Sequence, residues 1–158
     1  MGAIMKLSIC DEVGADMRNR YQNTFRCKLL DTIKGINGAV VLRADLNDLG
    51  DPRQISRALK ALVQDGDLIK FGYGVYIKAE KTPYDDEPIM VVPLAQGCAE
   101  ALNRLGKRWR LGQVIRNYNE CKTQQVPAQF IIRLNDRFRG RLGTKKRRVI
   151  FEGGINAR

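Results

Sequence analysis

The sequence predicts an α+β protein made of two modules, one over residues 1–80 and a smaller, basic one over residues 89–158. In the first module, apolar residues recur at helical spacing and then give way to two short apolar segments around a Gly-Tyr-Gly turn. In the second module, segments typical of strands carry most of the excess lysine and arginine. Between the two, residues 81–88 contain two prolines and three acidic residues without an apolar pattern, which predicts a linker.

The first module is expected to begin with a helix over residues 16–34. Its apolar residues form one stripe, and Gly35 follows the last turn. The apolar segment 39–42 is long enough only for a short strand. Residues 43–49 then predict a short helix that ends at Gly50.

Residues 51–65 give the clearest local signal of the chain. Asp51 is a preferred capping residue, Pro52 suits the first helical position, and Gly66 follows the last turn. Residues 67–78 then predict a strand, a tight turn at Gly72–Gly74 and a second strand, because glycine accepts the positive φ of such turns.

The polar side of the helix over residues 51–65 carries basic, amide and hydroxyl side chains and no acid. These side chains donate hydrogen bonds to phosphates and to base edges in the major groove. The order of elements is that of a winged helix-turn-helix, in which the third helix enters the major groove and the hairpin contacts the adjacent backbone. The candidate DNA-binding residues are Arg53, Gln54, Ser56, Arg57 and Lys60 on the helix, and Lys70, Tyr73 and Lys78 on the hairpin.

The formal net charge of +11 lies entirely in the second half of the chain. Residues 1–91 hold 13 basic and 13 acidic residues, whereas residues 92–158 hold 15 basic and 4 acidic ones. Such asymmetry predicts a polyanionic partner for the second module. Nucleic acid is a better candidate than a membrane surface, because the charge does not fall on a basic amphipathic helix.

The second module is expected to contain a helix around residues 95–105, another from Trp109 to Tyr118, and a strand over Phe130–Leu134. Two further strands, 137–142 and 147–152, should form an antiparallel hairpin around residues 143–146. In a strand, three alternating arginines share one face of the sheet, where an anion would neutralise them. The candidate DNA-binding residues of this module are Arg137, Arg139, Arg141, Lys145, Lys146, Arg147 and Arg148.

The chain contains no histidine, and this excludes several kinds of active site. Ser-His-Asp and Cys-His nucleophiles, a histidine base and histidine-ligated catalytic metals are impossible, and no phosphate-binding glycine motif is present. Carboxylate or lysine chemistry stays open, but no spacing in the sequence indicates it. We therefore expect no enzymatic activity, no metal and no cofactor. Four widely spaced cysteines, no signal peptide and no apolar run long enough for a membrane span predict reduced thiols in a cytoplasmic protein.

Residues 55–78 resemble the winged-helix core of bacterial antitoxins of the abortive-infection E type, from type IV toxin–antitoxin systems. Residues 123–135 and 147–152 are similar to a later stretch of the same family. The resemblance implies a transcriptional repressor that binds inverted repeats in its own promoter. It also implies a nucleotidyltransferase-like toxin as functional partner, countered without a stable complex.

Two other functions stay open on the sequence alone. The basic second module could bind RNA, although no RNA-recognition pattern is present. The chain could also be an adaptor from a mobile element that blocks a host machine through its basic face. From the charge and the linker, we expect residues 1–80 to fold alone but to bind DNA weakly.

Overall fold

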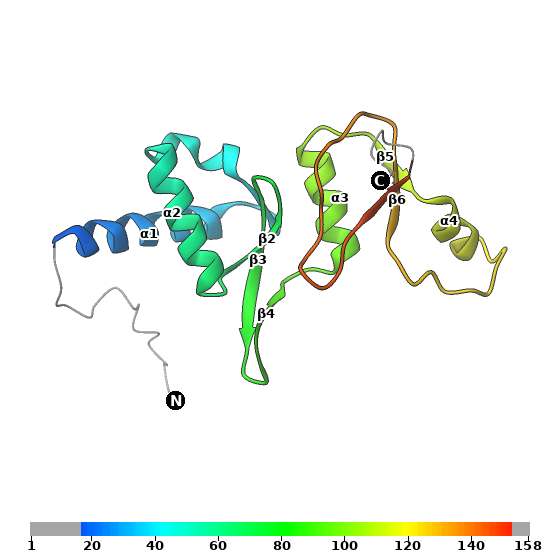
Figure 1. The fold of residues 1–158 in the computed structure, drawn as a ribbon, viewed down its shortest axis with the longest axis horizontal. Helices are drawn as coiled ribbons and strands as arrows, with labels where there is room; N and C mark the ends of the chain where they lie inside the picture. The colour runs from blue at the N-terminus through cyan, green and yellow to red at the C-terminus, as the bar shows by residue number, and fades with distance from the viewer. Residues whose placement is uncertain (1–16, 153–158) are drawn as a thin grey trace.

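The computed structural model describes residues 17–152 and confirms a mixed α+β architecture (Figure 1). None of the helices in this range is both long and apolar enough to cross a membrane. In chain order, the elements are α1 (Met17–Gly35), β1 (Val40–Leu42), the 3₁₀ helix η2 (Arg43–Leu49), α2 (Pro52–Gln64), β2 (Leu68–Gly72), β3 (Val75–Thr82), β4 (Asp85–Met90), α3 (Leu94–Arg104), β5 (Trp109–Leu111), α4 (Gln113–Asn119), β6 (Ile131–Leu134) and β7 (Ile150–Glu152).

The first sheet has two buried faces. Its strands run antiparallel in the order β1-β3-β2, and β4 pairs with the far end of β3. The register places Val41 opposite Tyr76 on one face and Val40 opposite Ile77 on the other, because successive side chains of a strand alternate. The face with Val41 packs against α1, η2 and α2.

Helix α2 forms as its sequence predicts. The side chain of Asp51 accepts a hydrogen bond of 3.0 Å from the backbone N–H of Arg53, and Pro52 occupies the first turn. One side of the helix is buried against Leu29, Ile33 and Leu46. The buried residues of α2 are Ile55, Ala58, Leu59 and Leu62.

The linker predicted at residues 81–88 is wrong, because these residues continue the first sheet. Strand β3 extends to Thr82, a turn follows, and β4 begins at Asp85 in an antiparallel register with β3. Pro88 is tolerated there because β4 has β3 as its paired neighbour, and a proline that lacks an N–H is accommodated in an edge strand. The composition of residues 81–88 predicted a segment without secondary structure, but the backbone pairing of the first sheet continues through it.

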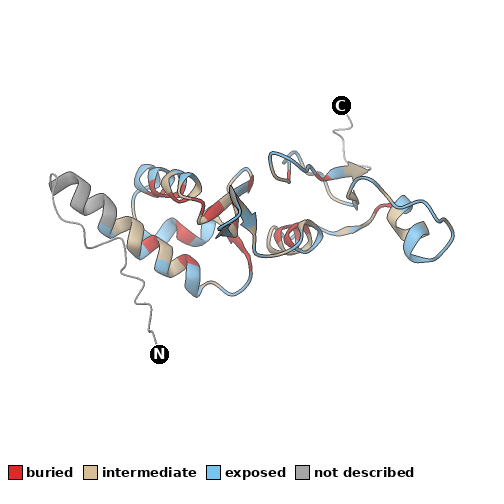
Figure 2. Ribbon diagram, turned by 90° about the horizontal axis from the view of Figure 1, so that it is seen from below, coloured by how far each residue is buried: buried red, intermediate tan, exposed pale blue. Residues whose placement is uncertain are grey.

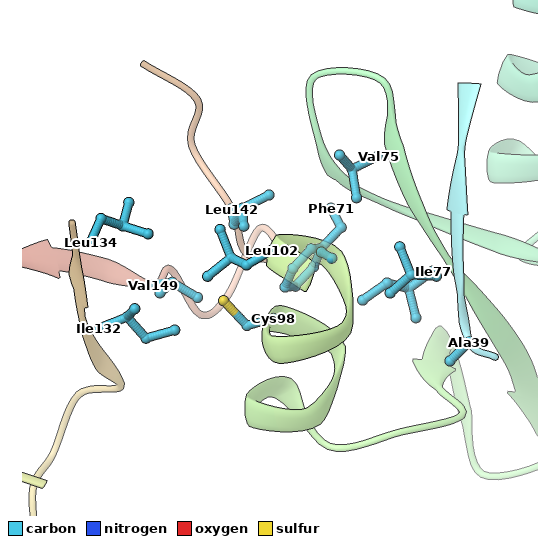
Figure 3. Close-up of a cluster of buried hydrophobic side chains, with 12 residues drawn as sticks. Ala39, Phe71, Val75, Ile77, Cys98, Leu102, Ile132, Leu134, Leu142 and Val149 are labelled. Carbon is cyan, nitrogen blue, oxygen red and sulfur yellow. The ribbon is translucent and has the colours of Figure 1, made fainter. Parts of the chain in front are cut away.

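Helix α3 lies between the two sheets and shares one core with both (Figure 3). Cys98 and Leu102 of this helix lie between Phe71 and Ile77 of the first sheet and Ile132 of the second. The approach to the first sheet is close: a Cβ at Gly97 would lie 2.8 Å from the Cδ1 atom of Ile77. The two modules are therefore joined by buried apolar contacts.

Two charged side chains of α3 hold the free edge of β1. The carboxylate of Glu100 accepts hydrogen bonds from the backbone N–H groups of Val40, at 3.0 Å, and Ala39, at 3.2 Å. Arg104 donates to the carbonyl of Val40 and, at 2.8 Å, to the carboxylate of Asp45. These bonds satisfy an otherwise unpaired strand edge.

The second sheet has the order β5-β6-β7, with β6 antiparallel to β5 and parallel to β7. The strand expected at Phe130–Leu134 is present from Ile131. The helix expected from Trp109 is only partly present, because Trp109–Leu111 form β5 and α4 begins at Gln113. Trp109 pairs with Leu134 and packs on the core around α3, which favours an extended conformation there.

The long basic hairpin expected over residues 137–152 is reduced to its turn. Backbone bonds join Leu142 to Val149 and Thr144 to Arg147, but residues 137–141 form no strand. Phe138 packs edge-on against Phe151, with ring centroids 5.4 Å apart, while β7 pairs with β6 instead. The packing of these two rings and the pairing of β7 with β6 replace the backbone pairing of the expected hairpin. Arg137, Arg139 and Arg141 therefore do not share a face of a strand.

The cysteines differ from the expectation of four reduced thiols. Cys27 is disulfide-bonded. Cys98 and Cys121 are free. Cys98 is fully buried in the core around α3, and burial raises the pKa of its thiol to about 12, so it stays protonated.

Candidate nucleic-acid interface

The outward-facing residues of α2 are polar and exposed, and Figure 2 colours the ribbon by the burial of each residue. The sequence-predicted residues Arg53, Gln54, Ser56, Arg57 and Lys60 are all exposed. One of them is partly engaged, because the hydroxyl of Ser56 donates a 2.8 Å hydrogen bond to the carbonyl of Pro52. Ser56 therefore keeps acceptor capacity but has no free proton, whereas the guanidinium groups and Lys60 remain donors.

The turn between β2 and β3 presents Tyr73 to solvent. Its side chain is 94% exposed, which is unusual for an aromatic residue in a folded chain. Lys70 is exposed on β2 and lies in register with Tyr76, on the side of the sheet that carries α2. Lys78 is used otherwise: its ammonium group donates a 2.7 Å hydrogen bond to the carbonyl of Ile36, just after α1.

Arg43 connects the β2–β3 turn with the start of α2. Its backbone N–H donates to the carbonyl of Gly74 at 2.8 Å, and its guanidinium donates to the carbonyl of Pro52 at 3.2 Å. Burial raises the pKa of Tyr76, and the positive charge of the Arg43 guanidinium offsets part of this rise. Sequence reasoning missed Arg43 because its role depends on the distant Gly74 and Pro52, and no local pattern marks it.

The basic residues of the second module lie on irregular backbone. Arg137, Arg139 and Arg141 are exposed between β6 and the turn, and their exposure still alternates with the half-buried residues between them. The turn itself carries Lys145, Lys146, Arg147 and Arg148, all exposed. Lys146 forms a 2.5 Å ion pair with Glu87 of β4.

A backbone contact brings this basic segment to the β2–β3 turn. The N–H of Gly143 donates to the carbonyl of Phe71 at 2.9 Å, and Gly72 and Leu142 form an antiparallel bridge. The approach is tight, because a Cβ at Gly72 would lie 2.8 Å from the carbonyl oxygen of Arg141. The fold thus places cations of the second module beside the turn that presents Tyr73.

Comparison with protein-family models and with curated proteins finds no match to the chain. Within residues 17–152, no group of three or more cysteine, aspartate and glutamate side chains is arranged to hold a metal ion.

Proposed function

We propose that the protein is a transcriptional repressor that binds duplex DNA through an N-terminal winged helix-turn-helix. The order of α1, β1, η2, α2, β2 and β3, with the sheet order β1-β3-β2, supports this assignment. In this proposal α2 is the recognition helix and the β2–β3 turn is the wing. The observation that carries the proposal is the wholly exposed, acid-free polar face of α2.

Electrostatics supports a backbone-contacting role for the second module. Residues 92–158 carry the whole net charge of +11, and the turn over Lys145–Arg148 is exposed. Phosphate contacts position a protein on the duplex, and contacts of the recognition helix with base edges then specify the sequence. The hydrogen bond from Gly143 to Phe71 joins the basic turn of the second module to the β2–β3 hairpin. In this proposal, the basic turn contacts phosphates while α2 contacts base edges.

The role of antitoxin rests on the resemblance of residues 55–78, 123–135 and 147–152 to abortive-infection E type antitoxins. Under this proposal, the protein represses its own promoter from inverted repeats. A nucleotidyltransferase-like toxin is its functional partner, and the two form no stable complex. The chain acts in the cytoplasm, without enzymatic activity and without a cofactor.

The test is binding of the full chain to its own promoter as a fluorescently labelled duplex. We expect binding that survives excess tRNA and is at least about tenfold tighter than binding to a scrambled duplex of equal length. Equal affinity for both duplexes would contradict sequence-specific repression. Displacement by tRNA with no preference for the promoter would favour an RNA-binding function instead.

The antitoxin role needs a separate measurement. If the neighbouring gene encodes a nucleotidyltransferase that arrests growth when it is expressed alone, co-expression of the present protein should restore growth. Growth arrest that persists with abundant, folded protein would refute the antitoxin role and leave the repressor role to the duplex experiment.

A further inference from the structure

The outer face of the second sheet contains a small polar pocket. None of the residues that line it is among the DNA-binding candidates predicted from the sequence. Its volume is about 260 Å³, and it is lined by Arg110 of β5, Arg116 of α4, Arg133 of β6 and Asn135. The register places Arg110 directly opposite Arg133. The residues that alternate with them, such as Ile132 and Leu134, are buried in the core around α3, so the arginines project away from it.

This arrangement of charge is unfavourable in the unliganded protein. Like charges directly opposite each other on neighbouring strands repel, and Arg116 adds a third cation to the same pocket. Glu152 of β7 lies in register with Arg133. The ion pairs found among the described residues nevertheless do not involve Arg110, Arg116 or Arg133.

One of the arginines that line the pocket also has a donor without a partner. The Nε–H group of Arg116 is buried without a hydrogen bond. The other end of its guanidinium donates to the side chain of Gln113, which in turn donates to Asn117 at 2.7 Å. A buried donor without a partner is rare in folded proteins, so the protein alone does not satisfy this guanidinium fully.

We propose that this pocket binds a phosphate monoester. The three guanidinium groups that line the pocket and the carboxylate of Glu152, in register with Arg133, together carry a charge of about +2. This charge complements the dianion of a phosphate monoester near neutral pH. The planar fork of each guanidinium suits phosphate oxygens, and the amide of Asn135 adds a donor. The pocket is larger than a phosphate group, so part of an attached sugar fits as well. This site is independent of the surface of α2.

Calorimetric titration of the full chain tests the proposal with four probes: ribose 5-phosphate, ribose, and a five-nucleotide oligothymidylate with a 5′-phosphate or with a 5′-hydroxyl. The variants are Arg116→Gln, Arg133→Gln and Arg133→Lys, of which the last keeps the charge but loses the planar fork. The matched control is Lys122→Gln, because Lys122 is exposed beyond α4 and pairs with Glu120. Thermal unfolding identifies any variant that fails to fold.

We expect both phosphorylated probes to bind and ribose not to bind, and each pocket variant to weaken binding at least about tenfold. The Lys122→Gln variant should bind like the unmodified protein. An oligonucleotide that binds more than about tenfold tighter than ribose 5-phosphate identifies a nucleic-acid end as the source, and equal affinity identifies a small phosphorylated molecule. Three results would overturn the proposal: no saturation by either phosphorylated probe, equal binding of the 5′-phosphate and 5′-hydroxyl oligonucleotides, or unchanged binding in all three variants.

Discussion

At the residue scale, burial decides which of the chemically reactive groups are available. Cys98 lies in the core around α3, and burial raises the pKa of its thiol to about 12. Ser56 is exposed, yet its proton is donated to the carbonyl of Pro52. The sequence shows the residue type but not these surroundings, so the availability of each group had to come from the structure.

Alkylation of the free cysteines tests the burial of Cys98. Only about one Cys98 thiol in ten thousand should be ionised at pH 8, because its pKa lies some four units higher. We expect iodoacetamide to modify the exposed Cys121 in the folded protein and Cys98 only after unfolding in urea, as measured by peptide mass spectrometry.

The same shift has a defined sign for stability. The folded-state pKa of Cys98 lies above its usual value of 9.0, so the stabilisation from the protonated thiol is present below pH 9 and is lost as the pH rises toward 12.

In the alkylation experiment, rapid modification of Cys98 at pH 8 without denaturant would contradict the packing of α3 on both sheets.

At the scale of elements, capping residues and hydrophobic periodicity predicted the first module well. The cap at Asp51, the buried side of α2 and the β2–β3 turn all lie where the sequence placed them, because each depends on residues close in the chain. Three assignments were wrong: one overlooked a local β3–β4 hairpin in a segment rich in proline and acid, and two depended on contacts distant in the chain. Residues 81–88 complete β3, form a turn and begin β4. Residues 109–111 pair with β6, and residues 137–141 form no strand while Phe138 packs on Phe151.

Gly72 is the residue at which the second module contacts the β2–β3 hairpin most closely. The variant Gly72→Ala places a methyl group 2.8 Å from the carbonyl oxygen of Arg141, which is fixed backbone. We expect a loss of about 1–3 kcal/mol in the free energy of unfolding, measured in urea.

The matched control for this experiment is Gly35→Ala at the end of α1, where the added carbon would meet no atom within 4 Å apart from the adjoining backbone of its own helix. This variant should be neutral or slightly more stable, because alanine favours the helix. Equal stability of the two variants would show that the basic turn does not pack on Gly72.

At the scale of the whole molecule, the two predicted modules share one hydrophobic core. The sheet residues Val40, Phe71, Val75 and Ile77 are fully or almost fully buried, and α3 covers them. The asymmetry of charge predicted a division of the chain into two modules. It could not show that α3 binds the edge of β1 through Glu100, because this contact joins residues 60 and 61 positions apart.

This shared core reverses the expectation for the isolated first module. Residues 1–80 lack α3 and the end of β3, so the face that carries Val40 and Ile77 would be exposed to water. We predict that this fragment shows no cooperative urea transition by circular dichroism, whereas residues 1–152 unfold cooperatively. A cooperative transition of the short fragment, with stability equal to that of the longer chain, would show that the core around α3 contributes nothing to the first module.

The measurement closest to the central claim compares the promoter affinity of the double variant Arg57→Ala/Lys60→Ala with that of Lys28→Ala/Lys34→Ala. Both variants remove two exposed cations from a helix of the first module, the first pair from α2 and the second from α1. We predict that the α2 variant loses about 1–3 kcal/mol of binding free energy for each base-contacting residue and loses its preference over a scrambled duplex. The α1 variant should keep that preference. If the α2 variant, with its fold intact by circular dichroism, bound the promoter as tightly and as selectively as the unmodified protein, α2 would not be a recognition helix.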